Sequence, residues 1–292
     1  PATIIAKCPS HDEQSRNIAA LLGSYAREVN WYRELAPKSA VSRPYCYHAE
    51  ITDNRVDFAL LLGDCAPAAQ GDQLAGATAE TWKPAIIQLA ALHAPFWNKD
   101  VEADHPWVAN DSRQMVETML PMLTTGFAER YDERLAPDIL DLCRSFASNT
   151  AAYLDSQPSA NSIVHGDYRV DNLLFAPDGG VTVVDWQTLG YGCPYLDLSY
   201  CIGTSFADPV ERRAQEQGLF QLYIAALGSH GAQVDADAAW IDYRRYALSG
   251  VLMAIFASMN VERTERGDEM FALMAERPAR QALDLGSLDL LV

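Results

Sequence analysis

The sequence predicts an α+β protein with a small, strand-containing N-terminal lobe and a larger, mainly helical C-terminal lobe. A run over Val56–Leu62 that is apolar except for Asp57 is typical of a buried strand. The next segment, Ala66–Gly76, is rich in glycine, proline and alanine, which indicates a connector. Beyond it, apolar residues recur mostly at helical spacing. We therefore expect the N-terminal lobe over residues 1–65 and the C-terminal lobe over residues 66–292.

The N-terminal lobe is expected to contain a strand, a helix and a second strand. Ala2–Cys8 is a short apolar run with Lys7 near its end. From Asp12 to Leu35, apolar residues recur at helical spacing, and Pro37 breaks this pattern. The apolar run over Val56–Leu62 follows as the second strand.

The C-terminal lobe is expected to be helical on both sides of a short region of strands and turns. This central region covers residues 161–186. Helical periodicity is present over residues 81–96, 133–154, 211–227, 237–260 and 268–275.

Composition narrows the classes of function. The 292 residues carry a formal net charge of −17, which disfavours nucleic-acid binding because the chain would repel phosphates. The charge favours either a cationic substrate or, more simply, solubility. The six cysteines show no metal or disulfide spacing, so we expect free thiols in a reducing compartment. We find no signal peptide and no apolar stretch of the roughly 20 residues that a membrane span needs. A cytoplasmic protein is therefore expected, and its oligomeric state is left open.

Residues suited to chemistry are concentrated around one predicted β-hairpin. Two short apolar strands flank Asp178-Gly179, a dipeptide typical of two-residue hairpin turns. Such a turn would place Asn172 opposite Asp185, and a longer loop would shift this register by about one residue. Amide and carboxylate oxygens that meet at the open end of a hairpin suit Mg²⁺.

Asp167 lies just upstream of the hairpin, in a loop entered through Gly166. It can face the same point as Asn172 and Asp185 without being a metal ligand, as expected for a base beside a metal-held phosphate. Asp171 has two interpretations, a second base or a residue that stabilises the turn.

The string His165-Gly166-Asp167, followed by Asn172, resembles the H-x-D-x-x-x-x-N catalytic loop of kinases. Asp185-Trp186-Gln187 stands where protein kinases have Asp-Phe-Gly. The His-Gly-Asp form resembles the aminoglycoside phosphotransferase and choline kinase family. Within it, the string is most similar to ecdysteroid-kinase-like bacterial phosphotransferases and to kinase domains associated with acyl-CoA dehydrogenases.

The resemblance implies a bilobal protein-kinase-like fold and an ATP- and Mg²⁺-dependent kinase that phosphorylates a hydroxyl of a small molecule. It implies that Asp167 is the catalytic base and that Asn172 and Asp185 hold the metal. His165 is expected to brace the loop, and Asp197 to cap it.

The resemblance also implies nucleotide contacts in the N-terminal lobe. Lys7 is expected to contact the ATP phosphates, with Glu28 as its partner on the helix and Glu34 as the alternative. Adenine would be bound by backbone groups of a hinge formed by Asp64, Cys65 and Ala66. The chain starts at Pro1, without an initiator Met, and we expect the strands and phosphate-covering loop that precede the lysine in this family to be missing from it.

The acceptor is predicted from residues 237–277. Acids there alternate with arginines, and apolar and aromatic side chains are frequent. We expect an acceptor with a substantial apolar body and one reactive hydroxyl, such as a sterol-like alcohol or a hydroxyacyl compound. Arg263 or Arg266 either binds an anionic group of the acceptor or offsets neighbouring carboxylates. The alternative functions are an aminoglycoside-inactivating kinase and a catalytically weak, nucleotide-binding pseudokinase. The complete set of Asp167, Asn172 and Asp185 argues against the pseudokinase.

Overall fold

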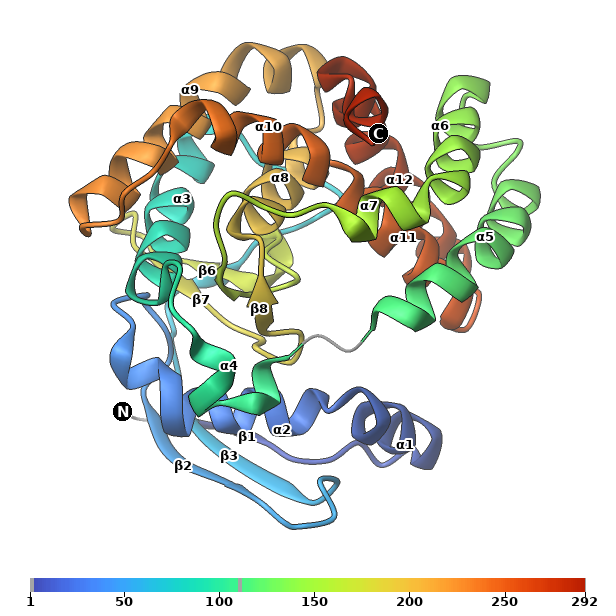
Figure 1. Cartoon of the computed structure of the whole chain (residues 1–292). Coiled ribbons are helices and arrows are strands. Elements are labelled where there is room, and N and C mark those ends of the chain that lie inside the picture. The colour runs from blue at the N-terminus through green and yellow to red at the C-terminus, as the bar shows by residue number, and fades with distance from the viewer. Residues whose placement is uncertain (1–2, 110–111, 292) are drawn as a thin grey trace.

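The computed structural model describes residues 3–109 and 112–291 and shows an α+β, bilobal architecture, as predicted (Figure 1). The small lobe contains an antiparallel sheet in the order β1-β3-β2, and Lys7 pairs with Leu60. Its strands and helices are β1 (Ile4–Lys7), α1 (Glu13–Leu22), α2 (Ser24–Asn30), β2 (Cys46–Ile51) and β3 (Phe58–Gly63).

The helix expected over residues 12–35 is interrupted. Gly23 adopts a left-handed conformation, with φ of 69°, and its N–H caps the carbonyl groups of Ala19 and Ala20. A left-handed glycine ends a helix although the apolar spacing continues through it, which explains why the periodicity did not reveal the break. Helix α2 then continues into a π-helical turn, η1 (Trp31–Leu35).

The connector passes from the small-lobe sheet into the sheet that carries the hairpin. Strand β4 (Ala69–Gln70) pairs with β6 (Leu173–Phe175), which pairs with β7 (Val181–Val183). A third pair joins β5 (Ser162–Val164) to β8 (Gly190–Gly192).

The hairpin turn is longer than the two-residue turn suggested by Asp178-Gly179. The N–H of Ala176 donates to the carbonyl of Gly180, and Leu173 pairs with Val183. Asn172 therefore lies opposite Val184, whose N–H donates to its carbonyl at 3.0 Å. This is the one-residue shift that the longer-loop alternative predicts.

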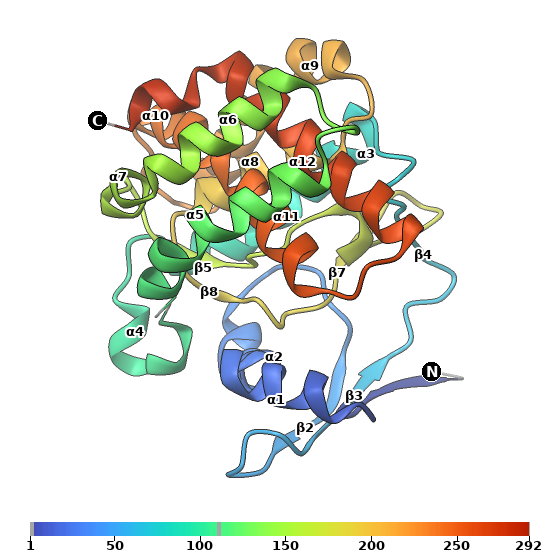
Figure 2. The ribbon, with the colours of Figure 1, turned by 90° about the vertical axis from the view of Figure 1, so that its right-hand side faces the viewer.

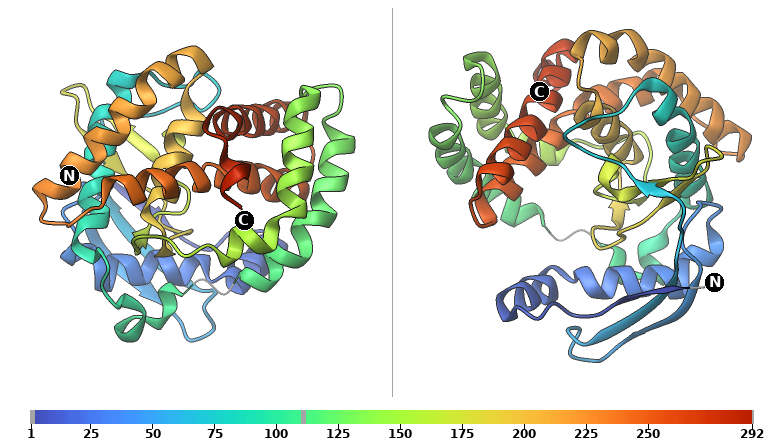
Figure 3. Two further views of the ribbon diagram at one scale, coloured as in Figure 1. Left: turned by 45° about the horizontal axis from the view of Figure 1, so that its top comes forward. Right: turned by 180° about the vertical axis from the view of Figure 1, so that it is seen from behind.

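The large lobe is mainly helical, and Figures 2 and 3 show α5 and α6 lying beside α11 and α12. Two apolar cores hold the molecule together, one around the hairpin, α3, α8 and α9, and one among α5, α6, α11 and α12. The helices of this lobe are α3 (Ala79–His93), α4 (Val101–Asp104), α5 (Arg113–Arg130), α6 (Pro137–Ser148), α7 (Thr150–Asp155), α8 (Pro194–Ser205), α9 (Pro209–Ser229), α10 (Ala236–Tyr246), α11 (Leu248–Asn260) and α12 (Glu265–Leu285).

Several helices differ from the expectation. The helix expected over 133–154 is divided into α6 and α7, and that over 237–260 into α10 and α11. Helix α12 is longer than predicted and contains Pro278. Helices α5 and α8 were not predicted. Among the described residues, no helix combines the length and apolar character needed to cross a membrane.

Candidate active site

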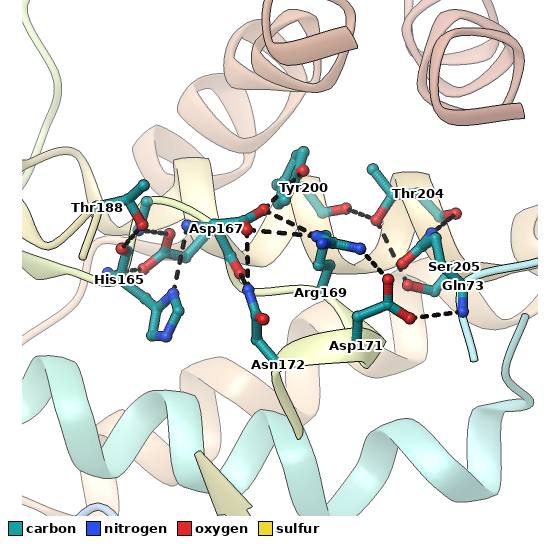
Figure 4. Close-up of polar contacts among 12 residues, drawn as sticks. Gln73, His165, Asp167, Arg169, Asp171, Asn172, Thr188, Tyr200, Thr204 and Ser205 are labelled. Atoms are coloured by element: carbon teal, nitrogen blue, oxygen red, sulfur yellow. Dashed lines mark hydrogen bonds and ion pairs between the residues drawn. The ribbon is translucent and has the colours of Figure 1, made fainter. Parts of the chain in front are cut away.

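The loop that follows β5 depends on a glycine. Gly166 has φ of 80°, and a Cβ at this position would lie 2.5 Å from the carbonyl oxygen of Thr188. Its left-handed conformation turns the chain between His165 and Asp167, whose side chains then point in different directions (Figure 4).

Helix α8 holds the start of this loop through Asp197. The buried carboxylate accepts hydrogen bonds from the N–H groups of His165, at 2.6 Å, and Gly166, at 2.9 Å. The structure thus confirms that Asp197 caps the loop. His165 braces it, because Nε2 lies 3.0 Å from the carbonyl oxygen of Val184 and Nδ1 accepts from the N–H of Asp167 at 3.3 Å.

Three side chains donate to the carboxylate of Asp167 (Figure 4). Asn172 Nδ2 lies 2.8 Å from Oδ2, and the Tyr200 hydroxyl lies 2.9 Å from Oδ1. Nε of Arg169 lies 3.2 Å from Oδ1 and 3.3 Å from Oδ2. The Asp167 side chain is still 21% exposed, so another molecule can reach a carboxylate whose orientation is fixed.

Asp171 connects the same loop to the connector. Its carboxylate accepts hydrogen bonds from Arg169 and, at 2.8 Å, from the N–H of Gln73. The side chain of Gln70 donates to the carbonyl of Asp171 at 2.6 Å. These contacts support the turn-stabilising interpretation of Asp171 over that of a second base.

Lys7 and Glu28 are in contact across the small lobe. Nζ of Lys7 lies 2.7 and 2.6 Å from the two oxygens of Glu28, and 3.6 Å from Oδ1 of Asp185. Glu34, the alternative partner, instead accepts hydrogen bonds at 2.8 Å from His105 and Trp107. Lys7 therefore lies between a helix carboxylate and a hairpin carboxylate.

Asp185 follows the hairpin in an unusual conformation. Its φ is 64°, and Oδ1 is buried without a hydrogen-bond partner in the described part of the chain. The next residue, Trp186, is fully buried and stacks on Trp31 with ring centroids 4.2 Å apart. Packing of Trp186 fixes the backbone while the Asp185 side chain remains 45% exposed.

The expected hinge lies at the end of β3. The carboxylate of Asp64 accepts hydrogen bonds from the Thr3 hydroxyl and, at 2.9 Å, from the N–H of Ala66. These two hydrogen bonds, that of Thr3 first, hold the pKa of Asp64 below its usual value. The carbonyl of Cys65 accepts from the N–H of Ala68 at 3.0 Å. Two backbone groups of the predicted hinge are thus already hydrogen bonded.

Sequence reasoning missed several residues of this network. Tyr200 and Gln73 reach the loop from α8 and from the connector. Arg27 joins α2 to the large lobe by donating to the carbonyl groups of Leu189, at 2.7 Å, and Ala109, at 2.8 Å. These contacts span 33 to 162 positions, and the sequence carried no local signal for them.

Comparison with known proteins identifies relatives over most of the chain. Residues 15–232 match the phosphotransferase enzyme family. Acyl-CoA dehydrogenase family member 10 from Mus musculus is 36% identical over 70 residues, which are 22% of this chain and 6% of that protein. A probable acyl-CoA dehydrogenase from Arabidopsis thaliana is 28% identical over 118 residues, or 38% of this chain and 14% of that protein. The matches thus span only a small part of the length of these relatives.

Solved structures share the fold at low sequence identity. A spectinomycin phosphotransferase in complex with ADP and spectinomycin gives a TM-score of 0.55 at 12% identity, covering 97% of this chain and 86% of that one. A choline kinase from Streptococcus pneumoniae gives 0.53 at 12%, covering 96% and 86%. An ADP-bound aminoglycoside phosphotransferase gives 0.50 at 16%, covering 96% and 88%. These similarities establish the kinase-like fold.

Proposed function

This chain belongs to the phosphotransferase enzyme family, and we propose that it transfers the γ-phosphoryl group of ATP to a hydroxyl of a small molecule, with Mg²⁺ as the metal ion. One observation carries the proposal. The carboxylate of Asp167 is held in one orientation and accepts a hydrogen bond from Asn172. It lies beside the end of the hairpin, where Asp185 and Lys7 form an ion pair. Phosphoryl transfer needs a base, metal ligands and a positive charge close together in this way.

The residues at the hairpin end fit a magnesium ion. Oδ1 of Asp185 has no hydrogen-bond partner among the described residues, and the Lys7 ammonium, 3.6 Å away, is its nearest cation and lies beyond hydrogen-bond distance. A buried carboxylate oxygen in this state can gain a closer cation. We propose that Asp185 and the amide oxygen of Asn172 are the protein ligands, since Mg²⁺ prefers oxygen and needs few protein ligands when phosphates supply others. Bound there, the ion would neutralise phosphate charge.

The nucleotide would bind between the two lobes, with its phosphates at the hairpin end and its adenine at the hinge. We propose that Lys7, held by Glu28, contacts the phosphates. Because Ala66 N–H and Cys65 C=O already have partners, the carbonyl of Asp64 and the N–H of Cys65 are the best candidates to contact adenine. The connector that follows this hinge begins at our proposed boundary between the lobes, which lies between residues 65 and 66.

Asp167 would act on the acceptor. Its carboxylate accepts a hydrogen bond from the acceptor hydroxyl and takes the proton as the oxygen attacks the γ-phosphorus. A new oxygen–phosphorus bond forms while the β,γ-bridging bond breaks, and ADP leaves with the electron pair. Positioning and charge compensation supply most of the rate, because this reaction asks for little covalent chemistry from the protein.

We propose that the acceptor has a substantial apolar body. Met253 lies one helical turn beyond Gly250, where α11 approaches the Tyr200 ring, and is half-buried without belonging to either core. Leu273 is also half-buried and outside both cores. It lies one turn before Arg277, whose side chain donates to the carbonyl of Thr204 on α8. These side chains can line an apolar wall near Asp167.

Charge in this region does not favour a polycationic acceptor. Arg263 is paired with Asp268 at 2.6 Å and Arg245 with Asp242 at 2.7 Å, so these acids are already compensated. The pairing of Arg263 also supports its charge-offsetting interpretation over binding of an anionic acceptor group. The names of the relatives, acyl-CoA dehydrogenases, make a hydroxyacyl compound our first candidate and a sterol-like alcohol the second.

The test is a comparison of acceptors. The purified chain is incubated with Mg²⁺-ATP and either hydroxyacyl compounds, steroid alcohols or kanamycin-type aminoglycosides, and acceptor-dependent ADP release is measured. We expect turnover with an apolar alcohol and none with the aminoglycosides. Turnover of aminoglycosides alone would favour the antibiotic kinase, and Mg²⁺-ATP binding without turnover of any acceptor would favour the pseudokinase.

A further inference from the structure

One face of α8 contacts three consecutive residues of the catalytic loop. Asp197 accepts from the N–H groups of His165 and Gly166, and Tyr200, three residues further along α8, donates to the carboxylate of Asp167. Residues three apart lie on the same side of a helix. The helix therefore fixes both the backbone of the loop and the side chain of Asp167 (Figure 4).

Tyr200 is built to be a permanent donor. Its side chain is 1% exposed, and its ring lies beside Gly250, where a Cβ would be 3.6 Å from Cδ2. Burial and then the nearby Asp167 carboxylate raise the pKa of the Tyr200 hydroxyl, so the proton stays on tyrosine. Asp167 is the sole hydrogen-bond partner of this hydroxyl in the described part of the chain.

We propose that Tyr200 is a positioning residue that selects the orientation in which Asp167 meets the acceptor hydroxyl. A carboxylate offers about four lone-pair sites. Tyr200 and Asn172 take one each, on opposite oxygens, and Arg169 is shared between the two oxygens. These contacts restrict the directions from which an incoming hydroxyl can donate to the carboxylate. This proposal rests on the proposed function of Asp167.

A purely structural role for Tyr200 makes different predictions. A hydrogen bond that only stabilises the fold would change stability and leave the rate of the folded enzyme intact. A bond that orients Asp167 changes kcat, without changing the KM for ATP, because the nucleotide contacts do not involve Tyr200. In that case, removal of the Tyr200 hydroxyl no longer changes kcat once the Asp167 carboxylate has been replaced.

The experiment is a double-mutant cycle on the full chain. Hydrolysis of Mg²⁺-ATP, with water as the acceptor, is measured for the wild type, Tyr200→Phe, Asp167→Asn and the double variant. We expect Tyr200→Phe to lower kcat about tenfold with an unchanged KM for ATP, and to have little further effect in the Asp167→Asn background. An unchanged kcat, or the same tenfold loss in both backgrounds, would overturn the proposal.

Tyr243→Phe is the matched control. Tyr243 is equally buried and its hydroxyl donates to a carboxylate, that of Glu216, at 2.7 Å, but it lies on α10 outside the site. We expect its loss to lower stability and leave kcat unchanged. A loss of kcat equal to that of Tyr200→Phe would mean general loosening of the fold and would contradict the positioning role.

The cycle is repeated with urea unfolding, which needs no turnover. We expect the two substitutions to be coupled in stability, because they remove the same contact. Absence of coupling would overturn the Tyr200–Asp167 contact and with it the proposal. Absence of phosphoryl transfer from the wild type to water and to every acceptor tested would instead contradict the proposed function of the chain, so the two failures are distinguishable.

Discussion

Lys7 and Glu28 form an ion pair that joins β1 to α2. Nζ of Lys7 lies 2.7 and 2.6 Å from the two carboxylate oxygens of Glu28. Glu28 is 1% exposed, whereas the Lys7 side chain is 28% exposed. A buried carboxylate without a partner is costly, so the pair holds the ammonium group in one place. The open side of Lys7 faces Asp185, 3.6 Å away.

The first prediction concerns this pair. Lys7→Met should weaken Mg²⁺-ATP binding at least about tenfold, because a charge beside the phosphates is lost. It should also destabilise the fold, because the buried Glu28 carboxylate loses its cationic partner and keeps only a long hydrogen bond from Gln187, at 3.4 Å. The charge-neutral double variant, Lys7→Met with Glu28→Gln, should regain stability without regaining affinity. Calorimetric titration and thermal unfolding would measure both, and wild-type affinity in the double variant would exclude Lys7 as a phosphate contact.

A second prediction concerns the base. Asp167→Asn should leave the fold and Mg²⁺-ATP affinity intact but lower phosphoryl transfer at least about 10²-fold, the usual scale for a positioned base. Asp171→Asn is the control, since Asp171 contacts Arg169 and Gln73 rather than Asp167. It should cost stability and only a small part of the rate. Equal losses of rate in both variants would revive Asp171 as a second base.

A third prediction separates the two metal ligands. Asp185→Ala removes a charged ligand and should abolish Mg²⁺-dependent nucleotide binding in a folded protein. Asn172→Ala removes a neutral ligand and should weaken binding less. Because Asn172 also donates to Asp167 at 2.8 Å, it should lower kcat more than affinity. Titration of Mg²⁺-ATP into both variants tests this, and unchanged affinity in Asp185→Ala would contradict the hairpin site.

The fold class and the hairpin that follows the His-Gly-Asp string could be predicted because their signals are local. The strands around Asp178-Gly179 and the helical stripes lie within about twenty residues each. Helix α8 was not predicted because it is buried along nearly its whole length. It therefore has no polar face and no apolar stripe at helical spacing. The break in the helix at Gly23 was not predicted because a left-handed glycine does not change the spacing of the apolar residues.

From spacing alone, contacts in the candidate site could be predicted only between residues that are close in sequence. Asp167 and Asn172 share a loop, and their contact follows from that spacing. The contact of Lys7 with Glu28 was expected from family resemblance, because no spacing argument joins a strand to a helix over 21 residues. Tyr200 had neither signal, since tertiary packing alone brings α8 to the loop.

A fourth prediction concerns the pH dependence of stability. The hydrogen bond from Arg263 to Asp268, at 2.6 Å, holds the pKa of this carboxyl below its ordinary 3.8. A group whose pKa is lowered by folding stabilises the protein at pH above its unfolded value, and this contribution disappears as the pH falls through the folded value. Asp268→Asn should therefore destabilise the protein at pH 7 and progressively less below about pH 4.

Urea unfolding of the wild type and Asp268→Asn over this pH range would measure the difference. Glu265→Gln, an exposed change in the same first turn of α12, is the control and should show a smaller effect. A pH-independent difference between wild type and Asp268→Asn would contradict the ion-pair explanation.

The last prediction concerns the glycine of the His-Gly-Asp string. Gly166 and Gly179 have nearly the same backbone conformation, with φ of 80° and 88°. Alanine at either position costs about 1 kcal/mol or slightly more for the left-handed conformation. Only at Gly166 does the new Cβ also meet a neighbour, the Thr188 carbonyl oxygen at 2.5 Å; at Gly179 it meets open space. Gly179→Ala should therefore lose a little stability and no activity. Gly166→Ala should lose more stability and most turnover, because relief of the contact moves the loop that carries Asp167. Similar unfolding free energies and rates for the two variants would show that the close approach to Thr188 does not position the loop.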